Sequence, residues 1–434
     1  MIKAHSDRTV LVLAGAELLG AIGMQIAVFA LPLAALEVFD ASPMQVACLN
    51  LMESAAALAF GLVVAAFIDR VPGATAITIA NALRLIGCAS VALSLYACPA
   101  FAILFVCFFI LGVSNLINEA GVNSTIVSVV GRNTQSLNRA NSLLRSSGVI
   151  SELGGIALGG IVVSVLTFAT TMAVGGVSFG LALGLSLILW VGLRRSGKLG
   201  EYFSRARADA VDESSSELHG SSLRGLRYIF GSIFLKRLTL TSFHFNFFSA
   251  VFQAVFVVYC VQVLGFRPWA LSVVGVAGAI GGLVGAVAAS TSFSSERARG
   301  IYALSIGLPA LSIALMLASQ LSESTLVRVS IVGLAEFIFG LCMVLCIVLF
   351  NTARQQCSPD SMVGEISATE RTIALAGEVP GFLIGGVLAT AFSLQLAMWV
   401  AVAGIVFAPA WLWRLRVWPS EAGIGSTTVE KEIV

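Results

Sequence analysis

The sequence predicts an all-α membrane protein of twelve transmembrane helices in two pseudo-symmetric bundles of six. Apolar residues make up 58% of the chain and charged residues 11%, against roughly 45–50% and about 25% in soluble domains. The mean hydropathy is +0.97. A charged, glycine-rich segment occurs twice, once on each side of the single long polar stretch. Together these features indicate a two-halved membrane protein.

The predicted spans are apolar windows of about 20 residues, long enough to cross a bilayer. Short turns with Pro or Gly separate several of them. The windows cover residues 9–33, 44–68, 74–97, 100–125, 146–169, 171–193, 238–263, 269–290, 301–319, 327–350, 364–391 and 394–413.

Four regions follow from these windows. Residues 1–193 form an N-terminal six-helix bundle, and residues 238–413 form a C-terminal one. Residues 194–237 form a cytoplasmic linker whose acidic, Ser-rich middle is typical of a flexible segment and whose end, Leu223–Phe230, is amphipathic. Residues 414–434 form a cytoplasmic tail.

The distribution of Lys and Arg predicts the orientation. If the N-terminus is cytoplasmic, 20 of the 25 basic residues lie on the cytoplasmic side. Only Arg267 and Arg328 lie on the outer side of the membrane, and the other three basic residues lie within spans. Because positive residues accumulate in cytoplasmic loops, we expect both termini in the cytoplasm.

The repeated segment spans Arg145–Gly160 and, 226 positions later, Arg371–Gly386. Arg145 aligns with Arg371 and Glu152 with Glu378, each pair seven residues apart and so two turns along one helix face. Halves with an even number of spans are parallel repeats. We place these charge pairs in the interface between the bundles. The Gly-x-x-x-Gly spacing within each copy is interpreted as close helix packing.

Ionisable groups inside membrane spans are costly and usually functional. The predicted spans contain more carboxylates than arginines, and a carboxylate without a cation in apolar surroundings tends to bind a proton. The alternative is that each Glu only hydrogen-bonds to a neighbouring helix. The ionisable residues within the spans are Glu17, Glu53, Arg84, Glu119, Arg145, Glu152, Glu336, Glu365, Glu370, Arg371 and Glu378.

Three carboxylates are the candidate proton-coupling sites. Glu119 lies between Asn115 and Asn123 at helical spacing, and this polar stripe cannot face lipid. Glu336 has no basic residue nearer in sequence than Arg328. Glu17 is the third candidate. Arg84 has two candidate partners: a structural pair with Glu53 is one, and Glu17 is the alternative.

The predicted seventh span carries aromatic residues on one helix face. They form either lipid and helix contacts or the wall of a cavity for a large apolar solute. The candidate cavity residues are Asn115, Asn123, His244, Phe248, Phe252, Gln253 and Phe256. For His244, a satisfied histidine within the core is the competing interpretation.

Other functional classes lack their sequence signatures. There is no phosphate-binding Gly-x-x-x-x-Gly-Lys-Ser/Thr loop and no His-Glu-x-x-His motif. We therefore expect no enzyme activity, no metal site and no cofactor, with a proton gradient as the energy source. The net charge of +2 gives no indication of a nucleic-acid partner.

The segment Gly61–Arg84 resembles the loop between spans 2 and 3 of the major facilitator superfamily. Asp69 and Arg70 match its Asp-Arg signature, whereas Ala65 replaces the usual glycine. The resemblance implies that Asp69 and Arg70 form a cytoplasmic gate. The region Gln135–Leu143 resembles the macrolide-efflux and enterobactin-exporter-like permeases.

This resemblance implies a secondary active transporter in the bacterial cytoplasmic membrane. We expect a monomer that exports a bulky, partly apolar organic compound by proton antiport with alternating access, with spans 1, 4, 7 and 10 lining the cavity. The cargo would be a drug, antibiotic, siderophore or other secondary metabolite. A proton-coupled importer or an uncoupled facilitator of a small organic solute is the alternative.

Overall fold

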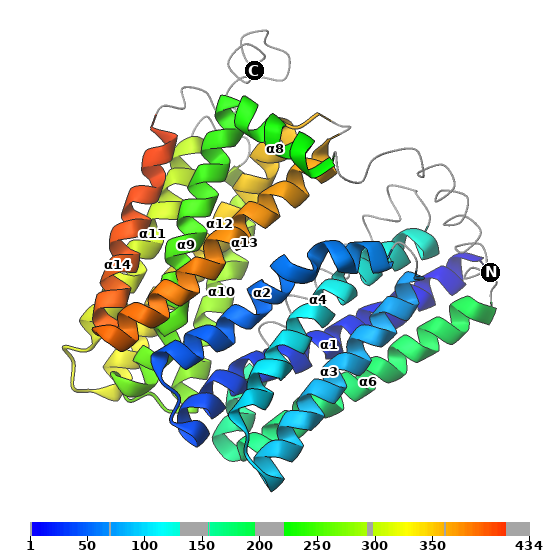
Figure 1. Ribbon diagram of the computed structural model, residues 1–434, viewed down its shortest axis with the longest axis horizontal. Helices are drawn as coiled ribbons and strands as arrows, with labels where there is room; N and C mark the ends of the chain where they lie inside the picture. Colours follow the sequence, from blue (N-terminus) through cyan, green and yellow to red (C-terminus); the bar gives the residue numbers. More distant parts are fainter. Residues whose placement is uncertain are drawn as a thin grey trace. The chain divides into compact units, whose positions relative to one another are not determined.

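The computed structural model describes residues 2–68, 71–130, 155, 157–195, 221–292, 298–359 and 362–413 (Figure 1). In these ranges the regular structure is helical. The chain divides into two compact units. Unit 1 comprises Met1–Asp40 and Met52–Ser216; unit 2 comprises Ala41–Leu51 and Glu217–Val434.

The helices follow the predicted windows closely. In the first half they are α1 (Ile2–Phe39), α2 (Pro43–Ile68), α3 (Gly73–Ala97), α4 (Phe101–Val130) and α6 (Phe168–Arg195). In the second half they are α8 (Ser221–Gly231), α9 (Ile233–Gln262), α10 (Pro268–Ser292), α11 (Ala298–Ser319), α12 (Thr325–Gln356), α13 (Val363–Ala391), α14 (Leu394–Phe407) and the short 3-10 helix η2 (Ala408–Leu412).

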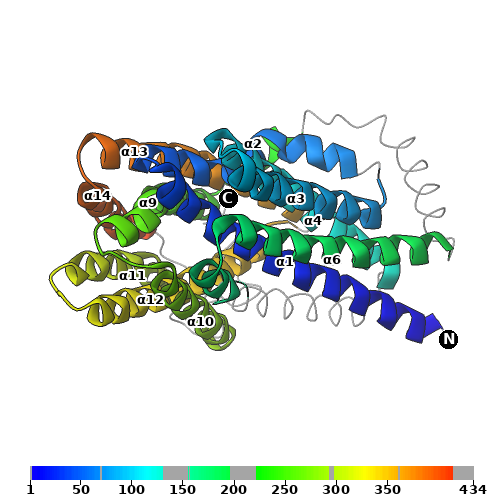
Figure 2. The same cartoon turned by 90° about the horizontal axis from the view of Figure 1, so that it is seen from below.

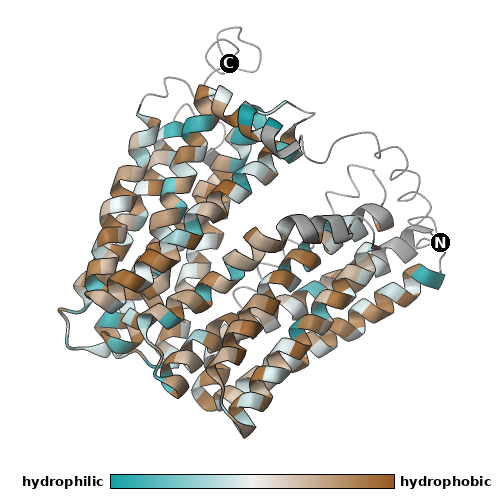
Figure 3. Ribbon diagram, in the orientation of Figure 1, coloured by the Kyte–Doolittle hydropathy of each residue, from teal (hydrophilic) through white to brown (hydrophobic). Residues whose placement is uncertain are grey.

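Eleven helices of the described part are long and apolar enough to cross a membrane. Figure 3 shows apolar residues along most of their length. The predicted fifth span, 146–169, lies partly outside the described residues, and its residues 157–165 are helical. The prediction of an all-α membrane protein with this order of spans is confirmed.

Helix contacts repeat between the two units. In unit 1, α1 packs on α6, α3 packs on α6, and α3 packs on α4; Figure 2 shows α1 and α6 side by side. In unit 2 the corresponding pairs are α9 with α14, α11 with α14, and α11 with α12. Each of these three pairs of spans in the first half therefore has its counterpart six spans later.

The duplicated glycines take part in this repeated packing. A side chain at Gly155 would meet Cβ of Gln25 in α1 at 2.6 Å, and one at Gly381 would meet the backbone oxygen of Phe247 in α9. Span 5 thus approaches span 1 as span 11 approaches span 7. Lipid tails are as apolar as the helices, so helices associate in membranes through close packing of this kind.

Some helices, such as α1, α4 and α12, extend a turn or more beyond their predicted windows. The tenth span was expected to end at residue 350, which placed Arg354 in a cytoplasmic loop, but α12 continues to Gln356 and buries Arg354 to 9% exposure. Within α12, Arg354 pairs with the carboxylate of Glu370 in α13, and hydropathy alone does not detect such a partner.

Candidate functional site

The predicted polar stripe lies on one face of α4. The side chains of Asn115, Glu119 and Asn123 are all exposed, whereas Asn118, next to Glu119 in sequence, is buried. The spacing of four residues holds the three exposed groups on one helix face. Exposed polar groups at this depth must meet water or protein rather than lipid. This face is therefore suited to line a path for a polar or partly polar solute.

Arg84 lies behind the stripe and is 4% exposed. Its Nη2 donates a hydrogen bond to Oδ1 of Asn115 at 3.1 Å, and its Nε donates to Oγ of Ser114 at 3.3 Å. The guanidinium also lies over the ring of Phe179, 5.8 Å from its centroid. One buried cation thus joins α3 to α4 and α6, and contacts the end of the exposed stripe.

Glu17 of α1 lies in the same cluster. Nδ2 of Asn118 donates to both of its carboxylate oxygens at 3.0 Å. Arg84 interacts electrostatically with Glu17 and with Glu53. A side chain at Gly20, one turn after Glu17, would meet Nη1 of Arg84 at 3.3 Å, so this glycine makes room for the guanidinium. Both carboxylates that the sequence suggested as partners of Arg84 therefore lie close enough to interact with it electrostatically.

Glu336, the candidate in unit 2, has different surroundings. It is half-buried on α12, and its Oε2 lies 3.1 Å from where a Cβ of Gly278 in α10 would be. Among the described residues, Glu336 has neither a hydrogen bond nor an ion pair. Arg328, its nearest basic residue in sequence, donates instead to the backbone oxygens of Ser322 and Leu264, at 2.6 and 3.1 Å.

The predicted cavity residues of α9 mostly contact other helices. Nε2 of His244 lies 2.8 Å from the backbone oxygen of Gly404 in α14, and its ring packs on Phe248. Phe252 is buried against Phe256 and against Phe339 of α12. Gln253 is the exposed member, hydrogen-bonded to Ser249.

Sequence reasoning missed the main ion pair of unit 2. Nη1 of Arg354 lies 3.2 Å from Oε2 of Glu370, which is 4% exposed, and Oγ1 of Thr239 donates to the other oxygen at 2.8 Å. This cluster joins α12, α13 and α9. Arg354 and Glu370 are 16 residues apart on different helices, so no local spacing revealed the pair. The adjacent Arg371, which the sequence favoured, is exposed, and Glu378 is half-buried.

Four predicted site residues lie outside the described part of the chain. They are the gate residues Asp69 and Arg70 and the first charge pair, Arg145 and Glu152. Within the described part, no group of three His, Cys, Asp or Glu side chains is placed to hold a metal ion.

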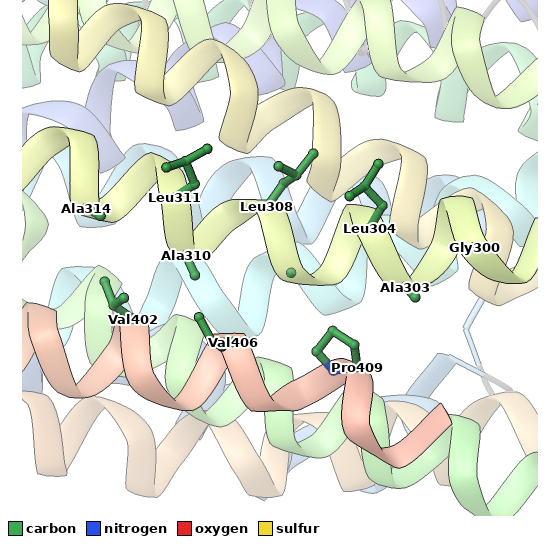
Figure 4. A pocket seen from close by; sticks show the side chains of 11 residues that line it. Gly300, Ala303, Leu304, Leu308, Ala310, Leu311, Ala314, Val402, Val406 and Pro409 are labelled. Atoms are coloured by element: carbon green, nitrogen blue, oxygen red, sulfur yellow. The ribbon is translucent and has the colours of Figure 1, made fainter. Parts of the chain in front are cut away.

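An apolar groove of about 660 Å³ lies between α11 and α14 (Figure 4). Leu304, Leu308, Leu311, Val402, Val406 and Pro409 are among the residues that line it, and none of the predicted site residues does. The groove is therefore separate from the charged clusters.

Comparison with known proteins decides the family. The sequence profile of the Major Facilitator Superfamily matches residues 13–376. The chain belongs to the Major Facilitator Superfamily. Members of this superfamily are membrane transporters, so secondary transport of a small molecule across a bilayer is supported. No curated protein sequence matches the chain.

Solved structures agree with this family. A bacterial homologue of the iron transporter ferroportin, in its inward-facing state, aligns with a TM-score of 0.72 at 16% identity over 94% of this chain and 98% of its own. A bacterial metal transporter aligns at 0.60 and 15%, over 94% and 98%. A bacterial homologue of the human lysosomal transporter Spinster, inward-facing and occupied, aligns at 0.66 and 14%, over 94% and 96%. At these identities the likeness establishes the major facilitator fold and leaves the cargo open.

Proposed function

We propose that this transporter exports a bulky, partly apolar organic compound across the bacterial cytoplasmic membrane in exchange for protons. The observation that carries the proposal is the exposed stripe of Asn115, Glu119 and Asn123 along α4. Its amides can hydrogen-bond to a solute, and its carboxylate can exchange a proton on the same face. Competition between the two at one surface is the physical basis of antiport.

The proton-responsive residues in this proposal are Glu119, Glu336 and Glu17. Glu336 packs on the glycine face of α10 without a cation among the described residues, which suits it to carry a proton. Glu17 accepts hydrogen bonds from Asn118 and interacts electrostatically with Arg84. Loss or gain of a proton there changes the electrostatic balance around Arg84, which also holds Asn115 of the stripe. Cargo binding and protonation are thereby linked in unit 1.

The nature of the cargo rests on the resemblance to macrolide-efflux and enterobactin-exporter-like permeases. The metals named for two of the similar proteins are not carried over, because the likeness to them at 15–16% identity extends to the fold. The proposal places both termini in the cytoplasm, where the excess of Lys and Arg favours them.

Transport in proteoliposomes tests the proposal. With a pyranine-filled lumen and an imposed pH gradient, addition of a macrolide or a lipophilic cation should cause substrate-dependent proton movement opposite to the substrate flux. Glu119→Gln and Glu336→Gln should each reduce this coupled flux about a hundredfold, the lower end of the effect expected for a positioned acid–base group.

Glu323→Gln is the matched control, because Glu323 is exposed between α11 and α12. Coupling at the native level in both the Glu119 and the Glu336 variants would refute their roles. Flux of substrate and protons in the same direction would identify an importer, and flux without protons would identify a facilitator.

A further inference from the structure

We propose that α8, together with the first turn of α9, forms a surface that binds anionic phospholipids of the membrane leaflet beside it. This surface consists of the exposed side chains of Arg224, Leu226, Arg227, Phe230, Ile233 and Lys236. The inference is independent of the cargo and of the proton-coupling residues.

One face of α8 is fixed to unit 2. Gly225 and Ile229, four residues apart, are buried. A side chain at Gly225 would meet Oγ1 of Thr369 at 2.6 Å and the backbone oxygen of Glu365 at 3.2 Å, both at the start of α13. Figure 1 shows α8 lying across the end of the unit 2 bundle, where it contacts α9 and α13. The helix is therefore seated by a specific contact, and its opposite face stays open.

The open face combines positive charge with apolar bulk. Leu226 is 37% exposed, Phe230 is 46% exposed and Ile233 is 55% exposed. Arg224 and Arg227 flank them, and Lys236 follows one turn into α9. No acidic residue occurs between Ser221 and Arg237. An amphipathic helix with basic and large apolar groups on its open side typically lies at a membrane surface.

The connection from α8 to α9 places the open face of α8 next to the membrane. α8 ends at Gly231, and Ser232 caps α9 by accepting a hydrogen bond from the backbone N–H of Leu235 at 3.3 Å. α9 is itself a candidate membrane span from Ile233 onward. The open face thus lies within a few residues of the point where the chain enters the bilayer.

Charge complementarity selects the ligand. Basic residues next to a membrane attract anionic lipid headgroups and lose this attraction within a Debye length. Leu226 and Phe230 would be placed at the acyl boundary while the two arginines meet phosphate. An acidic protein partner would match the charges but would leave the three exposed apolar side chains unexplained. The surface therefore fits a leaflet containing anionic phospholipid.

The test measures lipid binding by the full-length protein in detergent. Acyl-labelled phosphatidylglycerol and acyl-labelled phosphatidylcholine are titrated, and fluorescence anisotropy gives their affinities. We expect phosphatidylglycerol to bind more tightly than phosphatidylcholine, and the preference to shrink in high salt. Arg224→Gln/Arg227→Gln should weaken phosphatidylglycerol binding about thirtyfold, because each basic residue near an anionic surface contributes about a factor of five.

Three further variants keep the result interpretable. Arg224→Lys/Arg227→Lys keeps the charge and should retain the preference, which separates charge from folding. Arg267→Gln removes an exposed arginine beyond the other end of α9 and should leave binding unchanged. Phe230→Ser should weaken the binding of both phosphatidylglycerol and phosphatidylcholine. Unchanged phosphatidylglycerol binding in the double Gln variant, or an equal loss in Arg267→Gln, would overturn the proposal.

Discussion

The two units share their helix packing but differ in how they accommodate charge. In unit 1, the buried Arg84 donates to the neutral side chains of Asn115 and Ser114, and Glu17 accepts from the amide of Asn118. In unit 2, Arg354 and Glu370 form a buried ion pair, while Glu336 faces the glycine backbone of α10. The three helix pairings are therefore common to both halves, whereas the arrangement of their charged groups differs.

This difference separates two uses of polar groups in a membrane. A neutral amide carries both a donor and an acceptor, so it can hydrogen-bond to a neighbouring carboxylate in either protonation state. It therefore satisfies a charged group without fixing that group's protonation state. A buried ion pair is less tolerant, since loss of either partner leaves an uncompensated charge. Unit 1 thus has the more adaptable cluster, and the Arg354–Glu370 pair of unit 2 is better suited to hold α12 against α13.

The largest expected effect tests the shared architecture. Gly155→Val and Gly381→Val should each cost more than the roughly 1–3 kcal/mol of ordinary overpacking and prevent recovery of folded protein, because the added side chain would overlap Cβ of Gln25 or the backbone of Phe247. The measurement is the yield of monodisperse protein and its thermal midpoint.

Gly180→Val in α6 is the matched control, because a side chain there meets nothing within 4 Å. If one of the two repeat positions tolerated valine as well as Gly180 does, the packing would not be equivalent in the two halves.

The next effect tests the difference in charge. Arg354→Gln should cost about 3–5 kcal/mol, because Glu370 would stay buried without its cation. Asn118→Ala in unit 1 should cost less, about 1–3 kcal/mol, because it removes a neutral donor from Glu17. Thermal unfolding in detergent compares the two variants.

Arg354→Leu/Glu370→Leu should recover much of the loss, since a well-packed apolar pair can replace a buried ion pair. Arg371→Gln, at the exposed neighbour, serves as the control. Equal losses in Arg354→Gln and Asn118→Ala would remove the distinction between the units.

The smallest effect leaves the fold intact and compares two cysteines. Cys98 is exposed in the turn between α3 and α4 of unit 1, whereas Cys357 is buried at the end of α12. Burial raises the pKa of the Cys357 thiol to about 12. Since the thiolate is the reactive form, this thiol stays protonated and unreactive near pH 8, well below its pKa.

A membrane-impermeant maleimide added to intact cells, followed by peptide mass spectrometry, should modify Cys98 and spare Cys357. Cys98 is expected on the outer side, so its labelling also checks the orientation. Labelling of Cys98 only after the cells are broken would reverse the predicted topology. Cys357 should react once the protein is unfolded in detergent.

Much of the fold was predictable because hydrophobic length is a local property. The windows matched α3 and α13 to within a residue at each end. They ended the tenth span before Arg354 because charge usually marks a loop, whereas α12 continues to Gln356 and places Arg354 beside Glu370 of α13. The polar stripe of α4 was also predictable, since its period is that of the helix itself.

The partners of the charged residues were less accessible to sequence reasoning. Arg84 had two candidate carboxylates, and the structure places both within its electrostatic reach, with Asn115 and Ser114 as its hydrogen-bond acceptors. The aromatic face of α9 was visible as a pattern, but Phe248 and Phe252 pack on Gly404 and Phe339 of other helices. Periodicity identifies a shared face without identifying what covers it.

The sequence by itself determined that this chain is helical, crosses a membrane many times and repeats a charged, glycine-rich segment. Those properties follow from apolar run length, the positions of Lys and Arg, and repeated motifs, all of which are read along the chain. Only the tertiary structure decided that Asn118 holds Glu17, that Arg354 holds Glu370 and that α8 is seated on α13. These contacts join residues distant in sequence, and their energies depend on distances and burial that no local pattern contains.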